Sequence, residues 1–141
     1  MNKQDLNNEW FEMAKMDLDA AEYLLNMRPV PIEIICYHCE QSAEKMLKGV
    51  LAAHDVEPPK THDLLQLCKQ CCEIDEEYEQ FSDSCIELTP YGVQVRYPSG
   101  MELDETDMRC ALQEARKIYE FVTEMCISPD EDAEQERGLT P

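Results

Sequence analysis

The sequence predicts an all-α fold, an antiparallel up-and-down bundle of four to five helices. Three observations predict it: the placement of the prolines, an apolar period close to 3.6 residues between them, and the absence of strand patterns. Because proline cannot continue a helix interior, the chain divides into four proline-free segments, residues 1–28, 32–57, 60–89 and 99–128. Long helices joined by short links then favour antiparallel neighbours.

The first two segments each predict one long helix. Apolar residues follow steps of four and three from Trp10 to Leu25 in the first, and from Ile35 to Val50 in the second. Such a stripe marks the face of a helix that packs on a core.

The third segment predicts two short helices, because the acidic run at residues 73–77 interrupts its apolar period. Thr61 is the expected N-cap of the first of them, and Asp63 is expected in its first turn, where the helix dipole favours a carboxylate. In the last segment, a helix with core spacing from Met108 to Cys126 is expected to follow a cap at Asp104.

Composition predicts one domain over residues 1–127 and a disordered acidic tail over residues 128–141. No run of apolar residues reaches the roughly 18–20 needed to span a bilayer, and the N-terminus carries no secretory pattern, so we expect a cytoplasmic protein. The net charge of −19 argues against a broad basic platform for nucleic acid.

The eight cysteines are expected to be reduced thiols that mostly pack in the core. Two C-x2-C pairs, Cys36 with Cys39 and Cys68 with Cys71, raise the question of zinc. The 28 residues between the pairs exceed the usual spacing of zinc ribbons, and each pair lies within a helical pattern. We therefore expect neither a structural metal nor a cofactor.

The chain's scarce positive charge gathers in its second quarter. Residues 30–70 hold four lysines against six acidic residues, whereas the rest of the chain holds 8 basic against 25 acidic residues. At helical steps of about 100°, one arc of the second helix contains His38, Gln41, Lys45 and Lys48. His62 lies near the predicted start of the next helix, where free backbone N–H groups favour an anion. This arc is either a solvent-facing side that aids solubility or part of an anion site.

A second feature is the linker at residues 90–100, which reads Pro-Tyr-Gly-Val-Gln-Val-Arg-Tyr-Pro-Ser-Gly. Arg96 offers a planar fork of donors for phosphate or carboxylate, and Tyr97 could stack on a base. The alternative is that the tyrosines pack the loop on the bundle and Arg96 pairs with a carboxylate. No nucleophile and base stand in a known catalytic spacing around the three histidines.

These features together resemble the HEPN family of nucleotide-binding helical domains, over roughly residues 8–125. The resemblance rests on the first helix (Trp10, Ala14, Asp17, Leu18 and Ala21), on His-Cys-Glu-Gln-Ser-Ala-Glu-Lys-Met-Leu-Lys-Gly at 38–49, on Lys-Thr-His-Asp-Leu at 60–64, and on Tyr91 followed by Arg-Tyr-Pro at 96–98.

The resemblance implies a helical bundle that is often a homodimer and often pairs with a minimal nucleotidyltransferase in toxin–antitoxin systems. Many HEPN proteins are metal-independent ribonucleases with an R-x(4–6)-H motif. Arg96 occupies a position similar to that arginine, but no histidine follows it in the chain. Arginine, with a pKa above about 12, cannot replace the histidine as a base. The resemblance therefore favours a non-catalytic domain.

The sequence hypothesis is a HEPN domain that binds a nucleotide or a nucleotidyltransferase partner through His38, Lys45, Lys48, His62, Arg96 and Tyr97. The alternative is a ribonuclease toxin, with RNA as substrate, in which His38 or His62 replaces the missing histidine. A third possibility is an interaction module without a ligand, in which the basic residues are scattered over the surface.

Overall fold

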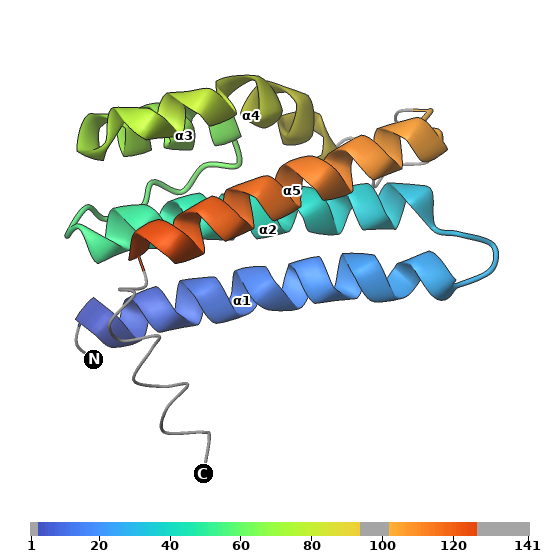
Figure 1. Cartoon of the computed structure of the whole chain (residues 1–141), viewed down its shortest axis with the longest axis horizontal. Helices are drawn as coiled ribbons and strands as arrows, with labels where there is room; N and C mark the ends of the chain where they lie inside the picture. The colour runs from blue at the N-terminus through green and yellow to red at the C-terminus, as the bar shows by residue number, and fades with distance from the viewer. Residues whose placement is uncertain (1–2, 94–101, 127–141) are drawn as a thin grey trace, which may run out of the picture.

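The computed structural model describes residues 3–93 and 102–126, with backbone alone for residues 3–8 (Figure 1). Its α-helices are α1 (Lys3–Tyr23), α2 (Ile32–Ala53), α3 (Leu64–Ile74), α4 (Ser82–Leu88) and α5 (Glu105–Cys126). Short 3-10 turns follow α1 (η1, Leu24–Asn26), precede α4 (η2, Glu76–Phe81) and follow it (η3, Thr89–Gly92). These ranges contain five α-helices and no strand, which confirms the predicted all-α bundle.

α2 is the central helix of the bundle. It packs on α1 along most of its length and on α5 across a second side, while α3 and η3 cover a third. Figure 1 shows α1 along one edge, α3 and α4 along the opposite edge, and α2 with α5 between them. A helix surrounded in this way must be apolar on most sides, and its buried residues run from Ile35 to Leu51.

The polar caps explain where the helices begin. At α5, the Asp104 carboxylate accepts from the Asp107 backbone N–H at 2.9 Å, and the Asp107 carboxylate accepts from the Asp104 N–H at 2.9 Å. The predicted cap at Asp104 is confirmed. The predicted cap at Thr61 is wrong, because α3 begins at Leu64 and the Asp63 carboxylate accepts from the Leu65 N–H. Thr61, two residues before Asp63, instead accepts from the Asp63 N–H.

The third segment contains two short helices, as predicted. Asp75 ends α3, and its side chain accepts from the Glu77 N–H to begin η2, which leads into α4. The acidic run is thus a capped turn between the two helices.

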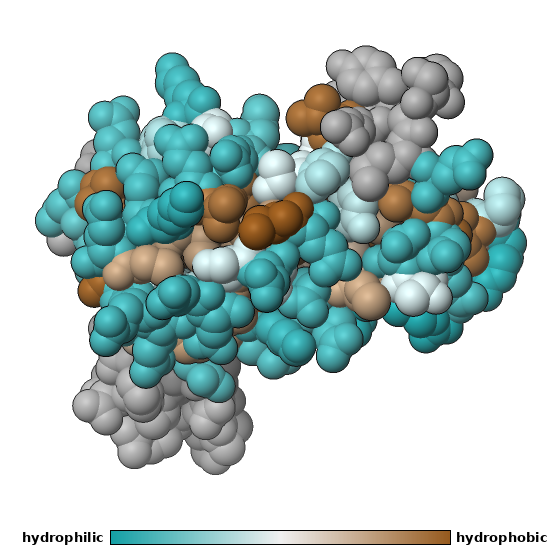
Figure 2. Space-filling view, turned by 90° about the horizontal axis from the view of Figure 1, so that it is seen from above, coloured by the Kyte–Doolittle hydropathy of each residue, from teal (hydrophilic) through white to brown (hydrophobic). Residues whose placement is uncertain are grey.

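The cysteines are free thiols in the structure, and five of them are buried core residues: Cys36, Cys39, Cys68, Cys71 and Cys85. None of the described helices is long and apolar enough to cross a membrane. Figure 2 shows a mainly hydrophilic surface on the side of α3 and α4, with hydrophobic side chains in small separate groups.

Candidate functional site

The polar side chains of α2 lie where this helix meets α1 and the segment before α3. Asp17 of α1 holds the first pair of them. Its Oδ1 lies 2.9 Å from His38 Nδ1, and its Oδ2 accepts from Lys45 Nζ at 2.5 Å. The side chains of Asp17, His38 and Lys45 are 12%, 26% and 18% exposed. One carboxylate therefore fixes a histidine and a lysine that stand two helical turns apart.

Glu44 of α2 holds the second pair in the same way. Its Oε1 lies 2.9 Å from His62 Nδ1, and its Oε2 accepts from Lys48 Nζ at 3.2 Å. Glu44 and Lys48 are nearly buried, whereas the His62 side chain is 67% exposed. Glu44 thus ties α2 to the segment that leads into α3 and presents the His62 imidazole at the surface.

A close approach of α1 supports the lysine of this second pair. Lys48 Nζ lies 5.9 Å from the centre of the Trp10 ring, a cation–π distance. The next residue, Gly49, lets the helices touch, because a Cβ there would stand 2.8 Å from Phe11 Cδ1 and 3.1 Å from Trp10 Cβ. The absence of a side chain at residue 49 therefore brings the Trp10 ring within reach of Lys48.

A third carboxyl group, Glu40, lies one turn before Glu44 and is completely buried. Gln41 donates to its Oε1 at 2.8 Å, and Oε2 has no partner among the described residues. Burial, followed by the charge of Glu44, raises the pKa of Glu40 to about 9. Glu40 is therefore a neutral acid near pH 7. It packs closely on Gly92, since a Cβ added to Gly92 would lie 2.6 Å from the Cδ atom of Glu40.

These contacts hold four of the six sequence-predicted site residues in two pairs, His38 with Lys45 on Asp17, and Lys48 with His62 on Glu44. Their arrangement contradicts a freely solvated arc, because both lysines are largely buried and each holds a carboxylate. The other two predicted residues, Arg96 and Tyr97, lie outside the described residues.

Comparison with known proteins identifies the family. The family model for the HEPN domain matches residues 8–125. The chain belongs to the HEPN family. No curated protein matches the chain.

A solved structure supports the same fold. The HEPN chain is similar to TT1696 from Thermus thermophilus, known from a crystal structure, with 26% sequence identity and a TM-score of 0.75. The similarity covers 88% of this chain and 98% of that chain.

The sequence interpretation of this HEPN domain missed the carboxylates that organise the site. Glu40, Glu44 and Lys48 stand four residues apart and share one side of α2, a signal available in the sequence. Asp17 stands in the string that resembles the family, but no spacing rule connects it to His38, 21 residues later. Only the packing of α1 on α2 shows its role.

Proposed function

We propose that this HEPN domain binds a nucleotide through its phosphates on the polar face of α2, as a free nucleotide or as one held by a nucleotidyltransferase partner. The observation that carries the proposal is that two nearly buried carboxylates fix the cationic side chains of this face, Asp17 holding Lys45, and Glu44 holding Lys48 and His62. The proposal includes Arg96 and Tyr97 on the strength of the sequence pattern alone.

The net charge of this face is more favourable to a polyanion than the net charge of the rest of the chain. Asp17 and Glu44 balance the two lysines, and the adjacent Glu40 is neutral, whereas the whole chain carries a net charge of −19. A phosphate approaching this face therefore meets little of the repulsion that it meets elsewhere. Each ammonium has three donors and gives one to its carboxylate, which leaves donors for phosphate oxygens.

The carboxylates also reduce the entropic cost of binding. A lysine on a free surface loses much rotamer freedom when it grips a ligand, but Lys45 and Lys48 are already held. This preorganisation supports a binding role over a merely solubilising one, for which fixed and largely buried ammonium groups are unnecessary.

Isothermal titration with ATP and with AMP tests the proposal. We expect ATP to bind, and Lys45→Gln and His62→Gln each to weaken binding about tenfold, the effect of losing one hydrogen bond to a charged group. Lys69→Gln is the charge-matched control for Lys45→Gln, because Lys69 is exposed on α3 and its loss changes the net charge equally. Unchanged affinity in both site variants would refute this site. Affinity that appears only when a nucleotidyltransferase is added would identify the partner-held nucleotide as the ligand.

A ribonuclease is the second candidate function, because His38 and His62 are each oriented as a general base would be. Each points Nδ1 at a carboxylate, which fixes the ring and leaves Nε2 for a substrate proton. This candidate predicts RNA cleavage in the presence of a chelator, lost in His62→Gln or His38→Gln and in Arg96→Ala. Intact RNA after incubation with the wild-type protein would exclude it under those conditions.

A further inference from the structure

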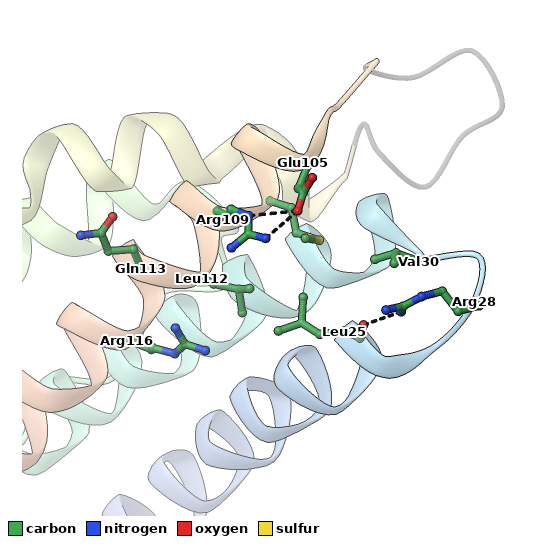
Figure 3. A pocket seen from close by; sticks show the side chains of 9 residues that line it. Leu25, Arg28, Val30, Glu105, Arg109, Leu112, Gln113 and Arg116 are labelled. Carbon is green, nitrogen blue, oxygen red and sulfur yellow. Dashed lines mark hydrogen bonds and ion pairs between the residues drawn. The ribbon is translucent and has the colours of Figure 1, made fainter.

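A pocket of about 600 Å³ lies at the other end of the bundle, where α1 ends and α5 begins. Figure 3 shows its wall: the first turns of α5 on one side, and η1 with the linker before α2 on the other. Residues on one face of α5 line it, from Glu105 to Arg116, with Leu25, Arg28 and Val30 opposite. The volume lies in the range of roughly 300–1,000 Å³ typical of small-molecule sites.

The charge of this pocket is the reverse of the chain's. It gathers Arg28, Arg109 and Arg116, three of the chain's five arginines, from positions up to 88 residues apart. Of the residues that line it in the described part of the chain, only Glu105 is acidic. A chain with 31 carboxylates thus concentrates a formal charge of +2 on the lining of one pocket.

The three guanidinium groups keep donors for a ligand. Arg28 donates Nη1 to the carbonyls of Leu25 and Met27, and no carboxylate in the described ranges pairs with it. Arg116 donates Nε to Glu22, and Arg109 donates Nε and Nη2 to one oxygen of Glu105. Each guanidinium has five N–H donors, so every one of the three retains some. The side chains of Arg109 and Arg116 are 72% and 45% exposed and are accessible from solvent.

We infer that this pocket binds a small phosphomonoester with an apolar or aromatic body, at a site separate from the polar face of α2. A phosphomonoester carries a charge close to −2 near pH 7, since its second pKa is about 6. It therefore complements the positive lining of the pocket, which remains positive when Glu22, the partner of Arg116, is counted. Guanidinium forks bind phosphate oxygens in pairs. Leu25 and Leu112 stand between the arginines (Figure 3). Val30 and Met108 also line the pocket, so it offers an apolar surface for the body of the ligand.

The test is isothermal titration of the full chain with phenyl phosphate at low ionic strength. We expect phenyl phosphate to bind. Inorganic phosphate should bind more weakly because it leaves the leucines uncovered, and benzoate should bind more weakly because it carries only one negative charge. Arg28→Gln with Arg109→Gln should weaken phenyl phosphate at least about tenfold. Both arginines are exposed, so circular dichroism should show an unchanged fold.

Two further variants keep the test sharp. Glu105→Gln removes the pocket's carboxylate and frees Arg109, and should tighten binding several-fold. Lys69→Gln, with the same charge change as one arginine substitution, should leave affinity unchanged. Absence of binding, or binding unaffected by the double arginine variant, would overturn the inference. If Lys45→Gln abolishes binding instead, the phosphate binds on the α2 face. If the double arginine variant changes its oligomeric state but not its affinity, the pocket is a protein interface.

Discussion

Two regions of this HEPN domain gather cationic side chains, and they hold them in different ways. On the polar face of α2, each lysine is held by a nearly buried carboxylate, so the cations are fixed and their charge is balanced. In the pocket between α1 and α5, Arg109 pairs with the lining Glu105, Arg116 pairs with Glu22, and Arg28 donates to backbone carbonyls. These arginines remain largely exposed. The first region should contribute to the stability of the fold, whereas the second should contribute little and be available to a ligand.

The difference has a physical origin in burial. A largely buried ammonium loses much of its hydration and needs a counter-charge, while an exposed guanidinium retains water around it. Substitutions of the carboxylates should therefore separate the two regions by their effect on the free energy of unfolding.

The largest effect is expected for Asp17→Asn. This change keeps the shape of the side chain but leaves Lys45 and His38 without their negative partner in a largely buried place. We expect the free energy of unfolding to fall by about 2–4 kcal/mol, since removing one partner of a buried ion pair typically costs about 3–5 kcal/mol and this pair is not completely buried. Urea unfolding followed by circular dichroism measures it. A loss below about 1 kcal/mol would show that Asp17 contributes no more to stability than one partner of an exposed ion pair does.

Glu40→Gln should show a pH dependence that sharpens the comparison. The pKa of Glu40 is raised to about 9 in the fold, so between about pH 4.5 and 9 the folded state holds a proton that the unfolded chain releases. Stability then falls as pH rises, by at most about 1.4 kcal/mol per pH unit from this group. The glutamine variant should lose this slope and be the more stable protein at pH 8, by about 1–3 kcal/mol.

Unfolding curves of the wild type and Glu40→Gln at pH 6, 7 and 8 provide the measurement. The decisive quantity is the difference between the two proteins at each pH, since other groups titrate equally in both. A difference that does not change with pH would mean that Glu40 is ionised in the folded protein.

Gly49→Ala should cost about 1–2 kcal/mol, because the added methyl group meets Phe11 and Trp10 and separates α1 from α2. Combining it with Phe11→Ala should give a loss smaller than the sum of the two, because the smaller residue makes room for the methyl group. Free-energy losses that add exactly, measured by urea unfolding, would show that the methyl group added at Gly49 and the Phe11 ring do not compete for the same space.

The smallest effect is expected for Glu22→Gln, which removes the partner of Arg116. Both side chains are more than 40% exposed, and exposed pairs contribute at most about 1 kcal/mol. A loss equal to that of Asp17→Asn would contradict the distinction between the two regions.

The sequence predicted the fold well because helices leave local signals. Proline spacing, apolar period and the cap at Asp104 are all read within a few residues, and each agrees with the structure. The cap at Thr61 was wrong because Thr61 and Asp63 both suit that position, and the choice depends on where the chain turns into α3.

The candidate sites were less predictable because they depend on packing. The cations of α2 were found because they share one helix, but Asp17 reaches them only through the contact of α1 with α2. Arg109 and Arg116 stand seven residues apart on one face of α5, a visible spacing. Nothing local connects them to Arg28, which joins them only when the end of α1 packs beside α5.

The central claim is that the polar face of α2 binds nucleotide phosphates. A two-dimensional NMR titration of ATP into the isotope-labelled protein tests it most directly, in the Arg28→Gln, Arg109→Gln background so that the second pocket does not contribute. We predict saturable shifts at Lys45, Lys48 and His62, with smaller changes at Lys69. Shifts confined to residues 105–116, or no shifts at millimolar ATP even with a nucleotidyltransferase added, would contradict the account.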